Sequence, residues 1–189
     1  MDSWPVPPPE GYTVDDLLTL KDLPPRTELI DGSLIFVSPQ NDFHSVVRCL
    51  LEQGLRRSLP AHLRVRRGMA VVLDVRNGAR PDLLVVRAEA VTGRRQTRYD
   101  VADVELAVEV VSPDSESRDR DTKPHKYARA GIPNFWLVEM AGAADTPVVH
   151  TYVLDPVKKV YESTGTHLKQ LSVDLPYAIN VDLTEIDRL

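Results

Sequence analysis

The longest stretch of helical periodicity runs from residue 44 to residue 59, where apolar side chains recur every three or four positions. The apolar residues that share this face are Val47, Leu50, Leu51, Leu55 and Leu59. Charged residues lie off the face, so the pattern predicts an amphipathic helix with one buried side. Cys49 borders the apolar face, and we expect it to pack in the protein interior.

Runs of apolar and β-branched residues indicate strands. Two runs, residues 82–86 and 103–112, are almost continuously apolar, which is typical of strands covered on both faces. The pair Asn77-Gly78 is predicted as a turn. Further strands are predicted over residues 63–75, 134–139, 148–154 and 160–162, and near Val181.

Two shorter helices are predicted from the residues at their ends. Thr13 is a suitable N-cap for a helix over residues 14–20. Gly131 suits the C-terminal end of a helix over residues 123–130. The polar segment over residues 114–121 is predicted to be the loop that leads into this second helix.

The order of these elements predicts the fold class. From residue 44 onward the order is αβββαβ, which indicates an α/β (α+β) protein with a mixed central sheet flanked by helices. Before this core, a short helix precedes a hairpin of residues 27–31 and 33–37. Extra strands follow the core at the C-terminus. Residues 1–12 are predicted to be a flexible, proline-rich arm, and residues 13–189 a single domain.

Composition narrows the class of protein. The 189 residues are 42% hydrophobic and 27% charged, as in ordinary globular proteins, which excludes a disordered or collagenous chain. Apolar runs are far shorter than the roughly 18 to 20 residues that cross a bilayer, so no membrane partner is expected. No secretory signal is visible, and Cys49 is the single cysteine. We therefore expect a cytoplasmic protein.

Charge is distributed unevenly along the chain. The net charge is −5, but residues 48–98 contain twelve arginines and four acidic residues, a net charge of +8. Such a segment is either a surface that faces phosphates or a solvated face whose arginines pair with acids elsewhere in the fold. The arginines that we predict to contact nucleic acid are Arg56, Arg57, Arg64, Arg66 and Arg67.

Two carboxylates lie in strands that otherwise read as buried. Asp82 begins one strand, and Glu109 lies in the middle of the next. An ionised carboxylate inside an apolar sheet is costly unless a cation compensates it. Two such groups at adjacent strand ends suit a hard divalent ion such as Mg²⁺. The alternative is that each acid pairs with an arginine, and Arg80 and Arg118 are near in sequence.

Several segments, in this order, resemble the Uma-type restriction endonuclease family within the PD-(D/E)XK nuclease superfamily. The resemblance extends from about Thr13 to about Leu154. The segments that carry it are Glu28-Leu29-Ile30-Asp31-Gly32, Ser38-Pro39 with His44, Pro81-Asp82, residues 106–113, and residues 118–123 with 127–133 and 136–138.

The resemblance implies roles for individual residues. Asp82, Glu109 and the backbone carbonyl of Val110 would hold the metal, Mg²⁺ or Mn²⁺. The lysine of the superfamily motif should come two residues after the acid, but that position is Val111. Lys123 is the substitute that the family pattern offers, at the entrance of the following helix, where it could act on the attacking water or the scissile phosphate.

Three further residues have weaker assignments. Glu28 could add a third carboxylate from the hairpin, or it could pair with an arginine. His44 could contact phosphate or order water at the metal, or it could be an ordinary residue at the helix N-terminus. Tyr127 lies one turn beyond Lys123 on the same helix face, and we expect it to pack against the sheet.

Three functions follow as hypotheses. The first is a metal-dependent endonuclease that hydrolyses phosphodiester bonds, with DNA as the substrate implied by the family and a homodimer as the simplest way to cut both strands. The second is a nuclease-fold protein that binds nucleic acid or a protein partner without cutting. The third is a purely structural or assembly role, in which arginines hold Asp82 and Glu109.

Overall fold

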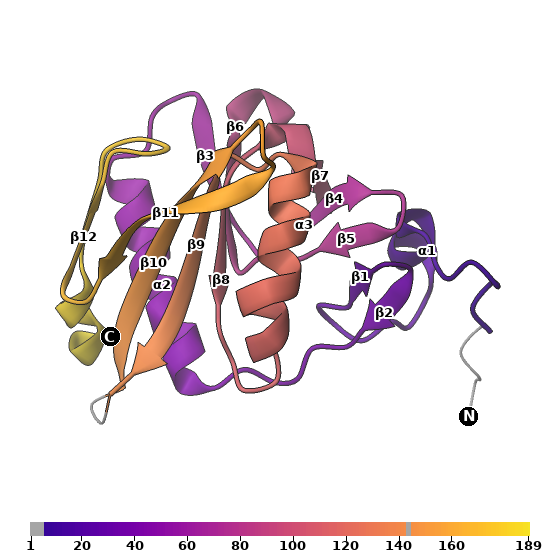
Figure 1. Ribbon diagram of the computed structural model, residues 1–189, viewed down its shortest axis with the longest axis horizontal. Coiled ribbons are helices and arrows are strands. Elements are labelled where there is room, and N and C mark those ends of the chain that lie inside the picture. Colours follow the sequence, from indigo (N-terminus) through magenta and orange to yellow (C-terminus); the bar gives the residue numbers. More distant parts are fainter. Residues whose placement is uncertain (1–5, 143–144) are drawn as a thin grey trace.

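A six-stranded mixed sheet forms the centre of the computed structural model, which describes residues 6–142 and 145–189 (Figure 1). The strand order is β11-β10-β9-β8-β6-β3. Strands β8 and β9 are parallel, and every other neighbouring pair in this sheet is antiparallel. The strands of this sheet are β3 (Leu63–Arg67), β6 (Leu83–Arg87), β8 (Val104–Val110), β9 (Asn134–Ala141), β10 (Thr146–Asp155) and β11 (Val160–His167).

Helices cover both faces of this sheet, as the sequence predicts, with α3 on one face and α2 on the other (Figure 1). The helical elements are α1 (Val14–Thr19), α2 (Asp42–Arg57), a π-helical segment (Arg118–Thr122), α3 (Lys123–Ala130) and short 3₁₀ turns at Ala88–Ala90, Val101–Asp103 and Leu183–Arg188. Among the described residues, no helix is both long enough and apolar enough to span a bilayer.

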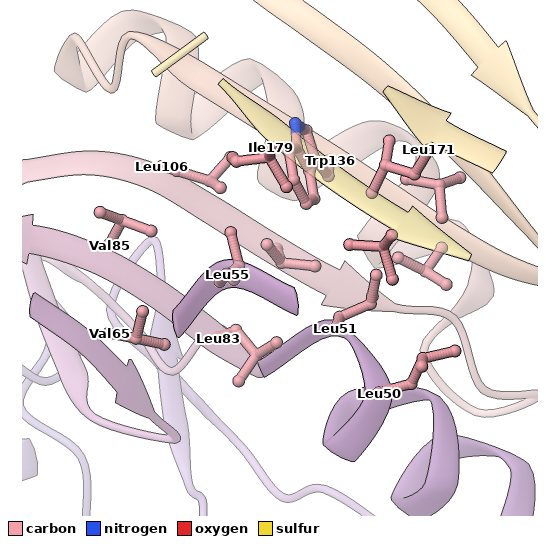
Figure 2. Packing of buried hydrophobic residues seen from close by; sticks show 14 of the residues in the cluster. Leu50, Leu51, Leu55, Val65, Leu83, Val85, Leu106, Trp136, Leu171 and Ile179 are labelled. Atoms are coloured by element: carbon pink, nitrogen blue, oxygen red, sulfur yellow. The ribbon is translucent and has the colours of Figure 1, made fainter. Parts of the chain in front are cut away.

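Alternation along each strand divides the interior into two cores. On β6, Leu83 and Val85 pack on the α2 side, whereas Leu84 and Val86 pack on the α3 side. The α2 side is the larger core, and Figure 2 shows its side chains between helix and sheet. Its labelled members are Leu50, Leu51, Leu55, Val65, Leu83, Val85, Leu106, Trp136, Leu171 and Ile179. Cys49, expected in the interior, is only half-buried beside this core.

The mixed central sheet is present as predicted, and a second, five-stranded mixed sheet that the sequence did not predict lies beside it (Figure 1). Its order is β2-β1-β5-β4-β7. Its strands are β1 (Glu28–Ile30), β2 (Ser33–Ile35), β4 (Ala70–Asp74), β5 (Asn77–Ala79) and β7 (Arg98–Asp100). At the C-terminus, β12 (Gln170–Val173) and β13 (Ile179–Asp182) form a separate antiparallel pair.

Two local features account for the second sheet. The predicted strand over residues 63–75 divides at Gly68, whose φ of +57° is in the left-handed region that favours glycine, and the chain passes there from one sheet to the other. The predicted turn at Asn77 is part of β5 instead, because its side chain accepts the Asp31 N–H at 3.0 Å and donates to Asp74 at 3.0 Å. The turn lies at Val75 and Arg76.

The N-terminal elements agree with the sequence. Thr13 caps α1, and its side chain and that of Asp16 each bond the backbone N–H of the other residue. The hairpin of β1 and β2 turns at Asp31 and Gly32, both at positive φ, as a two-residue hairpin turn requires. Residues 1–5 of the proline-rich arm lie outside the described residues.

The polar segment before α3 is helical, not a loop. Helical backbone begins at Glu116 and passes through the π-helical segment into α3. The Lys123 N–H bonds the Arg118 carbonyl, five residues back. This wider turn accommodates Pro124, which has no N–H to donate. Lys123 therefore lies within a continuous helical stretch rather than at a free helix N-terminus.

Candidate active site

Strand pairing brings Asp82 and Glu109 to one place. In the antiparallel pair β6 and β8, Leu83 is opposite Val108, so Asp82 comes opposite Glu109 at the next step. The backbone N–H of Val110 donates to Asp82 Oδ2 at 2.9 Å. Both acids are 2% exposed. They line one cavity, so the two side chains lie on the same side of the sheet.

This cavity is small, and most of its lining is polar. Its volume is about 10 Å³, which is room for roughly one water molecule or one small ion. Its lining comes from the hairpin, the start of α2, the ends of β6 and β8, and the helical segment that leads into α3. The charged and titratable side chains in the lining are Arg26, Glu28, His44, Arg80, Asp82, Glu109, Arg118, Asp119 and Lys123.

Asp82 is held as an anion. Arg26 Nη2 lies 2.5 Å and His44 Nε2 lies 3.0 Å from Asp82 Oδ1. Burial raises the pKa of Asp82, but the donors from His44, the Val110 N–H and Arg26 outweigh it and leave the pKa below its usual value. The Asn41 side chain caps α2 by accepting the His44 N–H at 2.9 Å, which fixes the helix end that presents His44.

Glu109 is in the opposite electrostatic situation. Burial raises its pKa well above the usual value; Lys123 lowers it, whereas the neighbouring acids raise it further. The Tyr127 hydroxyl donates to Glu109 Oε1 at 2.5 Å, and Lys123 Nζ lies 3.2 Å from the same oxygen. Tyr127 is fully buried, as expected, and in addition it bonds the carboxylate.

Lys123 lies at the centre of three carboxylates. Its Nζ is 3.1 Å from Glu28 Oε1, 3.1 Å from Asp119 Oδ1 and 3.2 Å from Glu109 Oε1, and the residue is 7% exposed. Burial lowers the pKa of the ammonium, but these carboxylates and Asp82 raise it well above its usual value. The ammonium therefore stays charged and neutralises the acids around it.

Asp119 is a buried carboxylate of the site that the sequence does not predict. It is 1% exposed and lies one helical turn before Lys123. Burial is the main cause of its raised pKa. The only signal in the sequence is the i, i+4 spacing between Asp119 and Lys123, and that spacing has meaning only if the segment is helical. Because the segment was predicted to be a loop, the signal was lost.

Glu28 reaches the cavity from β1 and is 2% exposed. Its Oε1 accepts the Arg80 backbone N–H at 2.8 Å and lies beside Lys123. Its Oε2 is buried and has no hydrogen-bond partner among the described residues. A buried carboxylate oxygen without a partner is rare, and it indicates a position where a water or a cation is expected.

The cations beside the two central acids differ from the arginines suggested by sequence proximity. Asp82 pairs with Arg26, and Glu109 pairs with Lys123. Arg80 and Arg118 line the same cavity, and the Nε atom of each is buried without a hydrogen bond to a described residue. Arg80 and Arg118 therefore add positive charge to a cavity that is also lined by acidic side chains.

The five predicted nucleic-acid arginines do not form one free surface. Arg56 and Arg67 both pair with the buried carboxylate of Glu52, and Arg66 donates to the Tyr99 hydroxyl at 2.9 Å. Arg64 donates to backbone carbonyls of residues 61 and 63, whereas Arg57 is exposed. Most of this group therefore has intramolecular partners.

Position also separates these arginines. Arg67 is paired with Leu83, next to Asp82. Arg56 lies about 18 Å along α2 from His44, at 1.5 Å per residue. Arg48, which was not among the predicted contacts, is closer to the cavity, and Asp82 and Arg26 are among its electrostatic neighbours. Of the arginines in the basic segment of residues 48–98, Arg80 lines the cavity and Arg48 is an electrostatic neighbour of Asp82, whereas Arg67 is held by Glu52.

A divalent ion can bind to these side chains only if some of them exchange their present contacts for contacts with the ion. In the described part of the chain, no three His, Cys, Asp or Glu side chains are arranged as a ready metal cluster. Mg²⁺, however, needs only one or two protein carboxylates and keeps several waters. The unpartnered Glu28 Oε2 and the room for one small ion support such a site. Arg26 would have to leave Asp82 for an ion to bind there.

Comparison with known proteins decides the family. The model of the family Uma2, whose description is "Putative restriction endonuclease", matches residues 14–184. The chain belongs to the Uma2 family. The match includes every residue that lines the cavity.

The fold has a counterpart among solved structures. The chain is similar to "a putative nuclease belonging to DUF820" from Anabaena variabilis ATCC 29413, with a TM-score of 0.68 and 16% sequence identity. The alignment covers 92% of this Uma2 chain and 96% of the other. At this identity the likeness shows the fold. No curated protein matches the sequence.

In this Uma2 protein the structure shows how position 111, where the resemblance leads one to expect a lysine, relates to Lys123. Val111 packs half-buried in the core on the α3 side, the side on which Glu109 also lies. A lysine at that position would therefore point toward α3. Lys123 places its ammonium 3.2 Å from Glu109 from the facing helix instead. A lysine at position 123 of the helix and a lysine at position 111 after the strand would thus both point toward the Glu109 carboxylate.

The raised pKa of Glu109 predicts how stability depends on pH. Above about pH 4.5, the usual pKa of a glutamate, Glu109 in the unfolded chain releases its proton, whereas Glu109 in the folded protein keeps it. In metal-free protein, the unfolding free energy of wild type should therefore fall relative to that of Glu109→Gln as the pH rises. The slope is at most about 1.4 kcal/mol per pH unit and ends at the folded-state pKa. Urea unfolding of both proteins in EDTA between pH 4.5 and 7 measures this difference. A constant difference would contradict the assigned direction.

Proposed function

We propose that the protein is a metal-dependent endonuclease that hydrolyses phosphodiester bonds, with DNA as its substrate and Mg²⁺ or Mn²⁺ as its cofactor. One observation carries the proposal. Lys123, although far in sequence from the motif position, lies 3.2 Å from Glu109 in the cavity that Asp82 also lines. Within the six-stranded sheet and its helices, the order α2, β3, β6, β8, α3, β9 supports a restriction-endonuclease-like core.

Each residue has a distinct role in this proposal. Asp82, Glu109 and the Val110 carbonyl would hold the divalent ion. When bound, the ion supplies Lewis-acid polarisation of the phosphate. Lys123 offsets negative charge at the scissile phosphate or orients the attacking water. Glu28 and Asp119 hold the lysine ammonium in place, since each lies 3.1 Å from it.

An ion at Asp82 would require that Arg26 leave the carboxylate. Arg26 is in a left-handed backbone conformation, with φ of 65°, and its side chain is 30% exposed. When the guanidinium leaves Asp82, it can move toward solvent and meet a phosphate, for which arginine is well suited. Arg48 is an electrostatic neighbour of both Asp82 and Arg26. We assign Arg26 and Arg48 to the phosphate backbone of the substrate.

A second candidate function is binding of nucleic acid or a protein partner without cleavage. It is favoured by the contacts of Asp82, whose Oδ1 is engaged by Arg26 and His44 and whose Oδ2 is engaged by Val110. If these partners persist with substrate present, the carboxylate has no free position for an ion.

Cleavage assays separate the two functions. The wild-type protein is incubated with supercoiled plasmid and with single-stranded DNA and RNA, in Mg²⁺, in Mn²⁺ and in EDTA. We expect nicked or linear DNA in either ion and none in EDTA. Binding in a gel-shift assay without cleavage under any of these conditions would favour the second function. Size-exclusion chromatography of the same sample tests the expected homodimer.

A further inference from the structure

A second hollow lies on the other flank of the helical segment that presents Lys123. It has a volume of about 200 Å³ and lies between this segment with α3 and the strands β9, β10 and β11. We call it the aromatic pocket. The lining residues used below are Arg120, His125, Phe135, Leu137, Tyr152 and Tyr161. The candidate active site uses none of them.

Three aromatic rings build one side of the aromatic pocket. Phe135 stacks on Tyr161, with ring centroids 5.4 Å apart and an interplanar angle of 26°. It also stacks on Tyr152, at 5.8 Å and 28°. Phe135 is buried, whereas the two tyrosines are half-buried. The Tyr161 hydroxyl donates to the Ile132 carbonyl at 2.9 Å, so the ring is fixed before any ligand arrives.

Hydrogen-bond donors and acceptors lie at the rim of the aromatic pocket. The Arg120 side chain is half-exposed, and its Nη2 lies 3.1 Å from Glu139 Oε1 and 3.3 Å from Glu116 Oε1. His125 is exposed beside it. The rim therefore offers hydrogen-bond donors from Arg120 and His125, together with nearby carboxylate acceptors. A planar ligand with donors and acceptors along its edge suits this combination.

The aromatic pocket is next to the candidate active site. Leu137, which lines it, is the ladder partner of Glu109 in the pair β8 and β9, and neighbouring strands are about 4.8 Å apart. Arg120 follows Asp119 directly, so consecutive residues of one helical segment line the two hollows. The two hollows therefore lie on opposite flanks of one helical segment, one strand spacing apart at Glu109 and Leu137.

We propose that the aromatic pocket binds one unpaired nucleobase of the nucleic-acid substrate, stacked on the tyrosine rings beside the scissile phosphate. The inference rests on the proposed function and specifies its substrate class. The volume is below the roughly 300 to 1,000 Å³ of pockets for drug-sized ligands, which suits a single ring system. Bases inside a duplex are not available for such stacking, so the substrate is single-stranded or locally unpaired.

Binding to matched strands tests the proposal without any need for cleavage. The affinity of a fluorescent oligothymidylate is compared, in EDTA and at fixed salt, with that of an abasic strand of equal length and charge. Because phosphate contacts are common to both strands, the ratio of the two affinities isolates the contribution of the base. We expect wild type to bind the base-containing strand about tenfold more tightly, the size of one stacking contact.

Substitutions assign this preference to the pocket. Tyr152→Leu should bring the ratio close to one, whereas the matched control Tyr152→Phe should retain it because the ring remains. Arg120→Gln changes an exposed side chain, and it should bring the ratio of the two affinities closer to one. This variant tests the pocket even if Tyr152→Leu fails to fold. Equal binding of the two strands by wild type, or an unchanged ratio in both Tyr152→Leu and Arg120→Gln, would overturn the proposal.

The outcome is separable from that of the proposed function. If the protein prefers the base-containing strand but cleaves nothing in Mg²⁺ or Mn²⁺, the aromatic pocket stands and the endonuclease assignment fails. If it cleaves DNA but binds abasic strands equally well, the endonuclease assignment stands and the aromatic pocket fails.

Discussion

Replacing Asp82 by asparagine is expected to abolish measurable cleavage. The substitution keeps the shape of the side chain but removes its negative charge. Three donors converge on the carboxylate, from Arg26, His44 and the Val110 N–H, and an asparagine amide would direct its own N–H groups at one of them. The fold should survive with a loss of about 2 kcal/mol in unfolding free energy, the typical value of a hydrogen bond to a charged group.

Plasmid cleavage and calorimetric titration with Mn²⁺ check this prediction together. The matched control is Asp100→Asn, which changes an exposed aspartate in the second sheet. It should leave the cleavage rate and the Mn²⁺ affinity unchanged. If the Asp82→Asn protein is folded and still cleaves at the wild-type rate, Asp82 does not take part in the reaction.

Replacing Lys123 by alanine is expected to have two large effects. Turnover should fall by a factor on the order of 10² to 10³, as for the loss of one electrostatic stabiliser elsewhere. In EDTA, unfolding free energy should fall by roughly 3 to 5 kcal/mol, because three buried carboxylates lose their shared cation. Mg²⁺ should restore part of this stability, since an ion that binds only the folded state stabilises it.

Thermal unfolding with EDTA and with Mg²⁺, and single-turnover cleavage, measure these effects. Lys126→Ala, on the same helix but paired with the exposed Asp31, is the matched control and should change neither by much. The double variant Val111→Lys with Lys123→Ala should recover part of the rate, because position 111 lies on the Glu109 side. Wild-type turnover by the single variant would remove Lys123 from the mechanism.

The sequence predicted those parts of the fold that depend on local pattern. The apolar spacing of residues 44–59 predicted α2 because its buried face is periodic, and β6 and β8 were recognised because both their faces are covered. Asp82 and Glu109 stood out as charges in apolar strands. Each of these signals is contained within one segment of the chain.

The remaining features depend on contacts between distant segments. Gly68 by itself does not indicate that the chain changes sheets there, because residues on both sides of it favour strands and a glycine within a strand more often marks a bulge. Arg26 was missed as the partner of Asp82, since 56 residues separate them. Asp119 was missed because a π-helical turn has no simple sequence signature. Site residues on irregular backbone are therefore the hardest to predict from sequence.

Crystals of the wild-type protein soaked in Mn²⁺ test the central claim most directly, because an anomalous difference map locates the ion without reference to activity. The account predicts a peak about 2.1 Å from carboxylate oxygens of both Asp82 and Glu109, a distance typical of a small divalent ion, with the Arg26 guanidinium displaced from Asp82. Density that still places Arg26 on Asp82 and Lys123 on Glu109, with no peak between the two acids at saturating Mn²⁺, would contradict it.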